Sequence, residues 1–330
     1  MSGKGQMMKA LLVKLLRSGE YVSGEAISSD LNVSRTAIWK QIKALKEQGY
    51  TIESTTNKGY RLLQSPDTVR AHDIIGRVST DSFGKTVFAY DSVESTQPLA
   101  HQVATNKGDE GTLIVANEQT QGRGRLGRKW LVGEGQTISM SLILRPTIPI
   151  AQTPQLTLVA AVAVVRAIEK VTGIDCEIKW PNDLLVKGKK LVGILTEMAA
   201  DPDQLHYVIV GMGINCQQSG ADFHEDVKGI ATSIYQETGK TVHRATLIAE
   251  VMNEFEWLYR CYQEEGFRVI KPLWEARSIS LHKKIHARTA KQVITGYASG
   301  LTDEGQLCIT DLNGTTHLIH SGDIELDTTS

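Results

Sequence analysis

Apolar and polar residues in the first fifty positions follow the period of three successive helices. Apolar residues between 8 and 16 recur every three or four positions, which predicts one amphipathic helix. A shorter helical pattern follows at 26–31. Ser34 is then a good N-cap for a third helix over 35–48, and Gly49 stands just past its end. The pattern therefore predicts a compact three-helix start to the chain.

The next residues alternate with the period of strands. Residues 50–53 and 60–62 predict two strands, and Asn57-Lys58-Gly59 predicts the turn between them. Three helices followed by a hairpin with a cationic tip describe a winged helix-turn-helix, whose capped helix enters the DNA major groove. The residues expected to contact DNA are Ser34, Arg35, Thr36, Lys40, Lys43 and Lys58.

Charge supports this interpretation of the N-terminal segment. Residues 1–65 hold ten lysines and arginines against five acidic residues, a net charge of +5, whereas the whole chain of 330 residues carries −1. A basic module with a helix-turn-helix pattern favours nucleic-acid binding. The alternative is a domain that binds protein and whose lysines form only a solvated helix face.

After a linker at Ser65-Pro66-Asp67, strand and helix patterns alternate up to about residue 277, which predicts an α/β domain built on a mixed sheet. From Ser278 onward, short alternating runs are separated by turn signals, which suits a small SH3-like β-barrel. The predicted fold is a multidomain α/β (α+β) protein with domains 1–65, 66–277 and 278–330.

Cysteine usage and hydropathy bound the compartment. The four cysteines are far apart and form no C-x-x-C pair, so we expect neither a disulfide framework nor a metal site. The longest apolar run, 158–165, is far shorter than the ~20 residues of a membrane span. These features predict a cytoplasmic protein that does not enter a membrane.

The stretch 122–130 concentrates three glycines and four cations. Glycine permits close backbone approach and arginine suits phosphate or carboxylate, so we expect a loop that closes over an anionic intermediate. An exposed basic turn is the alternative. The G-x-G-x-x-G spacing does not indicate a dinucleotide fold, because Gly133 and Gly135 follow where that fold needs a helix.

Three further segments carry candidate chemistry. Ser95-Thr96-Gln97 follows a predicted strand and offers donors and acceptors to a polar ligand, although helix capping alone explains Ser95. The turn 179–183 precedes Lys190, which enters an apolar strand and therefore needs an anionic partner. The segment 211–215 combines close-approach glycines with a terminal amide, which is a weak signal by itself.

Together these motifs resemble those of biotin–protein ligases, in the same order along the chain. The motifs are GRGRLGR at 122–128, KWPND at 179–183, KLVGI at 190–194 and GIN at 213–215. The N-terminal winged helix makes the chain similar to the bifunctional kind, which is both a ligase and a repressor of the biotin operon.

The resemblance implies roles for individual residues. Those expected to bind biotin are Ser95, Thr96, Gln97, Gln119, Arg123, Gly124, Arg125 and Lys190. Those expected near the nucleotide are Arg128, Asn182 and Asn215, and those expected to act in catalysis are Lys190, Arg125 and Asp183. Gln97 stands where some relatives have asparagine, and Leu126 where an arginine can occur. Asp183 has three open roles: holding Lys190, deprotonating the acceptor lysine, or shaping the turn.

The resemblance also implies a reaction and partners. Biotin and Mg-ATP would give biotinyl-5′-adenylate, which would then acylate a lysine of the biotin carboxyl carrier protein. The adenylate would act as corepressor by favouring a homodimer on operator DNA. Two alternatives stay open: a lipoate–protein ligase, and a biotin-sensing repressor without ligase activity.

Overall fold

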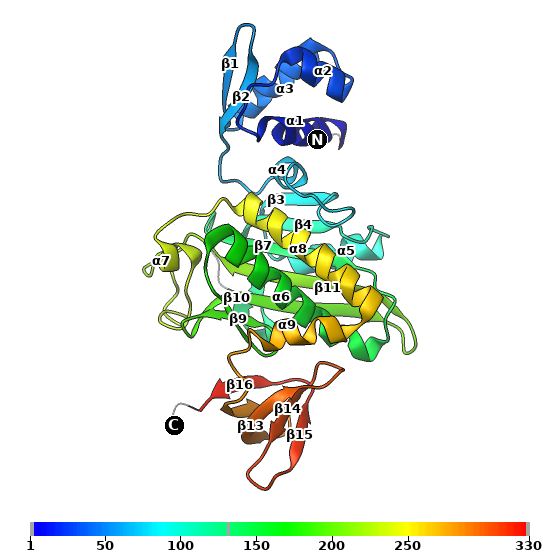
Figure 1. Ribbon diagram of the computed structural model, residues 1–330, viewed down its shortest axis with the longest axis vertical. Coiled ribbons are helices and arrows are strands. Elements are labelled where there is room, and N and C mark those ends of the chain that lie inside the picture. Colours follow the sequence, from blue (N-terminus) through cyan, green and yellow to red (C-terminus); the bar gives the residue numbers. More distant parts are fainter. Residues whose placement is uncertain (1–2, 131–132, 328–330) are drawn as a thin grey trace.

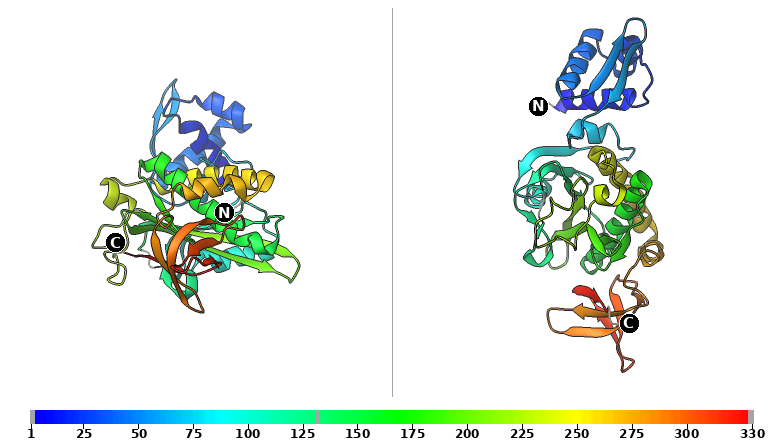
Figure 2. Two further views of the ribbon diagram at one scale, coloured as in Figure 1. Left: turned by 60° about the horizontal axis from the view of Figure 1, so that its bottom comes forward. Right: turned by 90° about the vertical axis from the view of Figure 1, so that its left-hand side faces the viewer.

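The computed structural model describes residues 3–130 and 133–327, in three parts that stack along the long axis of the molecule (Figure 1; Figure 2, right). The outermost residues of the predicted first and last domains, 1–2 and 328–330, lie outside the described residues. The N-terminal helical part and the C-terminal β part occupy opposite ends, and the large mixed part lies between them (Figure 1).

The N-terminal part has the predicted winged-helix order. It consists of α1 (Gly3–Leu16), α2 (Gly24–Leu31), α3 (Arg35–Glu47), β1 (Thr51–Thr55) and β2 (Gly59–Gln64). Ser34 caps α3, because its hydroxyl accepts a hydrogen bond from the Ala37 amide at 3.2 Å. Ile38, Ile42 and Leu45 turn one face of α3 into the core of this part. The opposite face leaves the helix cations exposed.

The middle part is built on a seven-stranded sheet with the order β3-β4-β7-β11-β10-β9-β8. Its strands are β3 (Val87–Val93), β4 (Leu113–Gln119), β7 (Thr137–Leu144), β8 (Glu177–Lys179), β9 (Asp183–Val186), β10 (Lys189–Ala200) and β11 (Leu205–Asn215). Strands β3 and β4 are parallel, and the other pairings are antiparallel. The predicted mixed sheet is confirmed.

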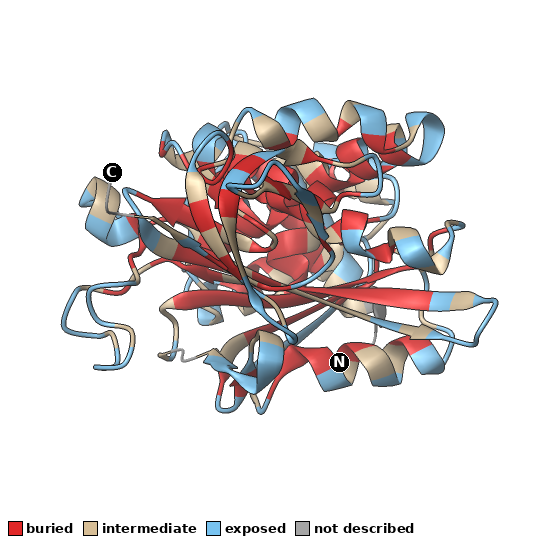
Figure 3. Cartoon of the chain, turned by 90° about the horizontal axis from the view of Figure 1, so that it is seen from below, coloured by how far each residue is buried: buried red, intermediate tan, exposed pale blue. Residues whose placement is uncertain are grey.

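Successive side chains along the strands point to opposite faces of the sheet, and different helices cover the two faces. Leu142 and Val210 belong to the main core beneath α6 (Thr153–Thr172) and α8 (Arg244–Glu265). Ile143 and Ile209, one position along each strand, pack on the opposite face with Ala100 of α5 (Thr96–Thr105). This two-residue period is that of a sheet covered on both sides. Figure 3 shows buried residues concentrated in the sheet and on the facing sides of its helices.

The C-terminal part is a five-stranded antiparallel sheet with the order β15-β14-β13-β12-β16. Its strands are β12 (Lys284–Arg288), β13 (Val293–Leu301), β14 (Leu307–Thr310), β15 (Thr316–Ile319) and β16 (Asp323–Leu326). The predicted turns are confirmed, since Gly305 and Gly314 have positive φ angles of 84° and 80° between paired strands. The short helix α9 (Lys271–Glu275) precedes this part. Helix α7 (Ile234–Thr238) lies earlier, before α8.

The first two parts meet at a buried polar joint on α4 (Ala71–Ile75), a helix that the sequence pattern did not reveal. The Tyr50 hydroxyl lies 2.9 Å from His72 Nε2, and Arg77 pairs with Asp73 at 2.8 Å. Arg77 also donates to the Ser65 hydroxyl at 2.9 Å. Burial lowers the pKa of His72 to about 4, so this imidazole is neutral near pH 7.

Within residues 3–130 and 133–327, no helix combines the length and apolar character needed to cross a bilayer.

Candidate functional site

A pocket of about 380 Å³ opens where the basic stretch 122–130 crosses the strands β9, β10 and β11. This volume lies in the usual range for small-molecule sites. The residues predicted to bind biotin or nucleotide all line it. They come from the end of β4, the N-terminus of α5, the basic stretch, the turn before β9, the start of β10 and the end of β11.

The basic stretch is a small hairpin rather than an unstructured loop. Gly122–Arg123 (β5) pairs with Lys129–Trp130 (β6), and a tight turn over 125–127 joins them. A Cβ at Gly122 would lie 2.3 Å from the Trp130 carbonyl oxygen, so only glycine allows this pairing. Leu126 has a left-handed φ of 55° at the tip and is 73% exposed. The sequence predicted a loop that closes over an anionic intermediate here, and the strand pairing in this stretch depends on the close contact at Gly122.

One end of the pocket, the neutral end, consists of Ser95, Thr96, Gln97, Gln119 and Ser141, all buried. The Thr96 amide donates to Gln119 Oε1 at 2.8 Å, and the Ser141 hydroxyl donates to Gln97 Oε1 at 2.7 Å. The Ser95 hydroxyl accepts from the Gln97 amide at 3.4 Å, so Ser95 caps α5 in addition to lining the pocket. These side chains present uncharged donors and acceptors to a ligand.

Sequence reasoning missed Ser141. The signal was present in β7, where Ser139 and Ser141 interrupt the apolar run 138–144 at a spacing of two. Both are buried, and a buried hydroxyl in a core strand normally has a polar partner.

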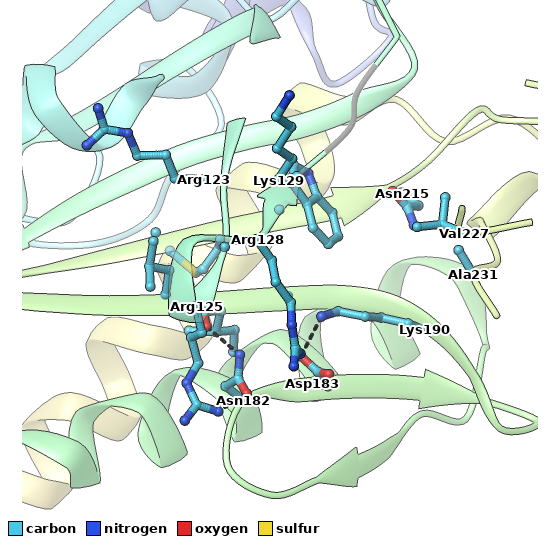
Figure 4. A pocket seen from close by; sticks show the side chains of 18 of the residues that line it. Arg123, Arg125, Arg128, Lys129, Asn182, Asp183, Lys190, Asn215, Val227 and Ala231 are labelled. Carbon is cyan, nitrogen blue, oxygen red and sulfur yellow. Dashed lines mark hydrogen bonds and ion pairs between the residues drawn. The ribbon is translucent and has the colours of Figure 1, made fainter. Parts of the chain in front are cut away.

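The other end, the cationic end, consists of Arg125, Arg128 and Lys190 together with Asp183. Lys190 Nζ lies 2.7 Å from Asp183 Oδ1. A dashed line in Figure 4 marks this ion pair. The predicted need of Lys190 for an anionic partner is thus met inside the protein, by the contact that the holding role of Asp183 requires. The backbone of Lys190 is fixed as well, because it bonds to Ile230 and Thr232.

The two arginines of the cationic end reach the C-terminal part. Arg125 donates to Asn182 Oδ1 at 2.9 Å and to the Ser321 hydroxyl at 3.2 Å. Arg128 forms an ion pair with Asp323 at the start of β16. Burial lowers the pKa of Arg125, while the nearby Asp323 and Asp183 carboxylates act in the opposite direction. The C-terminal residues in these contacts were not foreseen from the sequence.

Trp130 joins the hairpin to the strands. A Cβ at Gly213 would lie 2.5 Å from the Trp130 ring, and one at Gly193 would lie 3.0 Å from it. These two glycines therefore make room for the indole. Lys190 Nζ lies 5.7 Å from the ring centroid, within cation–π range.

The amides predicted near the nucleotide are held by backbone carbonyls. Asn182 donates to the Ile194 oxygen at 2.9 Å, and Asn215 donates to the Thr232 oxygen at 3.0 Å.

Two basic side chains of the hairpin do not point toward the charged pair of the pocket. In Figure 4, Arg123 and Lys129 extend away from the Asp183–Lys190 pair, and both are exposed. The predicted DNA-contacting residues lie in the winged-helix part, separate from this pocket.

The arrangement suits a ligand with an uncharged polar head and an anionic tail. The neutral end offers buried hydrogen bonds, and the cationic end offers charges whose present partners are acids or carbonyls of the protein. An incoming carboxylate or phosphate would exchange these partners for its own oxygens.

Family models match three segments of the chain. The Biotin/lipoate A/B protein ligase family matches residues 89–215, an HTH domain matches 8–61, and the Biotin protein ligase C terminal domain matches 281–327. The chain is 45% identical over 324 residues to the bifunctional ligase/repressor BirA of Bacillus subtilis, covering 98% of this chain and 99% of that one.

More distant proteins agree. BirA of Escherichia coli is 28% identical over 299 residues, covering 90% of this chain and 91% of its own. The structure of a biotin protein ligase from Aquifex aeolicus in complex with biotin and ATP superposes with a TM-score of 0.64 at 33% identity. It covers 74% of this chain and 99% of that chain.

Proposed function

The chain belongs to the family of bifunctional ligase/repressors, which are biotin protein ligases with an N-terminal helix-turn-helix domain, and we propose that its ligase reaction occurs in the pocket described above. Biotin would place its cyclic urea at the neutral end and its carboxylate beside Lys190. ATP would bind at the cationic end. The observation that carries this proposal is the joining of the two ends in one cavity.

In the first step, a biotin carboxylate oxygen attacks the α-phosphorus of ATP. The bond from that phosphorus to the bridging oxygen breaks, and pyrophosphate leaves. Two anions must approach each other, so positive charge at Lys190 and Arg125 lowers their repulsion and stabilises the transition state. The Lys190–Asp183 pair at 2.7 Å holds the ammonium in place before the substrates arrive.

Magnesium would enter with the nucleotide, as MgATP. Among the described residues, no group of three or more histidine, cysteine or acidic side chains is arranged to hold a metal ion. The pocket carboxylates Asp183 and Asp323 are paired with Lys190 and Arg128. Such a site fits an ion that is held mainly by phosphate oxygens.

In the second step, the ε-amine of a carrier-protein lysine attacks the acyl carbon of the adenylate. The anhydride C–O bond breaks and AMP leaves. The attacking amine must lose a proton, and Asp183 is the carboxylate nearest to Lys190 and the reacting end. The basic hairpin would cover the adenylate and exclude water, since this anhydride is hydrolysed readily.

An assay with two alternative substrates tests the ligase proposal. The purified protein is incubated with ATP, a biotin carboxyl carrier domain, and either radiolabelled biotin or lipoate, and pyrophosphate release and carrier labelling are measured. We expect both signals with biotin only. Labelling with lipoate would establish the alternative ligase, and the absence of both signals would leave a sensing repressor.

We also propose that the winged helix binds operator DNA and that the adenylate acts as corepressor by promoting a homodimer. The support is an exposed, basic α3 surface on a domain joined to the ligase. Allosteric couplings are typically about 1–3 kcal/mol, so the adenylate should raise operator affinity by about 5- to 150-fold. By the same linkage, DNA would favour the adenylate-bound state.

Sedimentation and operator titration, with and without biotin plus ATP, test this regulatory proposal. Arg35→Ala serves as the separation variant. Arg35 pairs with Glu25 at 3.2 Å, but both side chains are largely exposed, so loss of the pair should cost little stability. The variant should lose operator binding and keep ligase activity. The corepressor role would be refuted if neither dimerisation nor operator affinity changes when the adenylate forms.

A further inference from the structure

A chain of hydrogen bonds leads from the neutral end of the pocket outward to α5 and β11. Gln97 Nε2 donates to Glu197 Oε2 at 2.9 Å, and His101 Nε2 lies 3.2 Å from the same oxygen. His101 Nδ1 lies 3.3 Å from the Tyr207 hydroxyl, which in turn lies 3.1 Å from Thr105 Oγ1. Glu197 thus stands behind the pocket wall, in contact with a wall residue.

Glu197 fixes the direction of the bonds at Gln97. A carboxylate only accepts hydrogen bonds, so the amide nitrogen of Gln97 must face it and Oε1 must face the other way. Oε1 then accepts from Ser141, at 2.7 Å. The carboxamide is closely packed, because a Cβ at Gly211 would lie 2.7 Å from Gln97 Oε1.

The direction of the Ser141 hydrogen bond also limits the hydrogen bonds of Thr96. Ser141 has one hydroxyl proton and gives it to Gln97, so at its 2.8 Å contact with Thr96 it can only accept. Thr96 therefore receives no proton from Ser141, and both acceptors within reach of its own single proton, Ser141 Oγ and Gln119 Oε1, belong to the wall. Gln119 Oε1 accepts from the Thr96 hydroxyl at 3.1 Å and from the Thr96 amide at 2.8 Å, so the Thr96 hydroxyl has only lone pairs left for a ligand.

We propose that Glu197 is a positioning residue that sets the hydrogen-bond polarity of the neutral end, so that Thr96 presents an acceptor to the ligand next to the oxygen of Gln119. Such a wall selects a head group that brings N–H donors. The inference rests on the proposed function in one respect, namely that the ligand is biotin, whose cyclic urea carries N–H groups. The relay itself contains only residues of this chain.

The competing description is that Glu197 is a surface glutamate with no influence on the pocket, since its side chain is 38% exposed. Gln97 Nε2 would then depend on its other acceptor, the Leu195 oxygen. That contact is 3.5 Å long, at the limit of a hydrogen bond. The two descriptions differ in what happens when the carboxylate becomes an amide.

The test uses the full-length protein with Glu197→Gln, which keeps shape but allows the Gln97 amide to turn around. Binding of biotin is compared with that of its cyclic carbamate analogues, in which oxygen replaces one or other urea N–H. In the wild type, the ring oxygen of each analogue, a hydrogen-bond acceptor, would face acceptor oxygens of the pocket wall. We expect Glu197→Gln to bind biotin about tenfold more weakly, the scale of one hydrogen bond, and to lose most of its discrimination against the analogues.

Two further variants complete the design. Ser141→Ala interrupts the relay nearer the ligand and should reduce the discrimination as well. Glu118→Gln is the matched control. Glu118 and Glu197 both line a second pocket beside the basic hairpin, but Glu118 accepts a hydrogen bond from the Ser92 hydroxyl at 2.7 Å. It should keep wild-type discrimination. The KM for ATP should stay within about twofold in all three variants, because the relay does not reach the cationic end.

The outcomes separate this inference from the proposed function. If the wild type binds biotin and rejects the carbamates while Glu197→Gln discriminates equally well, the positioning role is wrong and the ligase proposal stands. Equal loss in Glu118→Gln would show a general charge effect and also overturn the inference. A wild type that does not bind biotin would remove the proposed function itself.

Discussion

The neutral and cationic ends of the pocket hold their polar groups in different ways. The neutral end uses uncharged side chains that are almost completely buried and bonded to one another, such as Thr96 and Gln119. The cationic end uses charged side chains that are more exposed, and each is bonded to a carboxylate, amide or carbonyl of the protein. Lys190, for example, is 34% exposed beside Asp183.

The difference separates recognition from chemistry. Buried neutral groups are strong discriminators, because a ligand that fails to match them leaves them unpaired in a dry environment. Charges that already have partners avoid mutual repulsion in the free protein, and they can exchange those partners for substrate oxygens. We therefore expect substitutions at the neutral end to change biotin binding, and those at the cationic end to change the reaction steps as well.

The largest effect is expected for Lys190→Ala. A charge-assisted contact to a buried anion is worth about 2–5 kcal/mol, so biotin binding and pyrophosphate release should fall by orders of magnitude. Lys187→Ala is the matched control, since this lysine precedes the same strand but pairs with Glu237 in an exposed position at 3.0 Å. Operator binding by the unliganded protein should not change. If the variant adenylates biotin at the wild-type rate, Lys190 does not contribute to this reaction.

A smaller effect is expected for Thr96→Val, which keeps the shape of the side chain. Loss of the hydroxyl leaves Ser141 without one of its partners, and an unpaired buried group costs about 1–3 kcal/mol. Calorimetry should show biotin affinity about ten- to a hundredfold lower, with the KM for ATP unchanged. Ser92→Ala, which removes an exposed hydroxyl outside the pocket, should bind biotin normally. An effect on ATP as large as that on biotin would contradict the division into two ends.

Asp183→Asn removes the charge of the ion-pair partner of Lys190. Without the carboxylate the Lys190 ammonium is no longer held at 2.7 Å, and we expect about tenfold slower adenylate formation from its misplacement. The transfer step is measured separately, with preformed adenylate and carrier domain. A slower transfer would support a general-base role for Asp183. An unchanged transfer rate would leave Asp183 with the holding role alone.

The smallest effect is expected for Arg125→Gly, because Arg125 bonds to neutral partners on Asn182 and the C-terminal part. Some adenylation should remain, because Lys190 still supplies positive charge, and the adenylate should dissociate several-fold faster, on the scale of one or two hydrogen bonds. A stopped-flow chase with excess unlabelled biotin and ATP measures this release. Asp323→Asn, which loosens the neighbouring Arg128, should show the same change to a lesser degree. Release at the wild-type rate in both variants would exclude a retaining role for these contacts.

The sequence predicted those parts of the fold that depend on local pattern. The winged helix followed from helical periodicity and the Ser34 cap, and the sheet from alternating or apolar runs. The pocket residues followed from motifs whose order resembles a known family, and the anionic partner of Lys190 followed from the cost of burying a charge. Apart from the resemblance, which uses the order of motifs between residues 122 and 215, these inferences need only the nearby sequence.

The remaining features depend on contacts between distant segments. Arg125 meets Ser321, and Arg128 meets Asp323, almost two hundred positions away. Neither contact leaves a periodic signal. Glu197 reads as an ordinary polar position on a strand, and only the folded sheet brings it beside Gln97. Helix α4 is too short to produce a recognisable helical period.

The polar joint at α4 limits how far the two activities are modular. Removing residues 1–65 would take away Tyr50 and Ser65, which are partners of His72 and Arg77. It would also uncover the tight packing at Gly76, where a Cβ would lie 2.7 Å from the Ala10 oxygen. A truncated protein would thus confuse loss of DNA binding with damage to the remaining fold. Substitution on the exposed face of α3 is the cleaner way to divide the activities, and an exchange of winged-helix domains between relatives would have to carry the joint residues along with the domain.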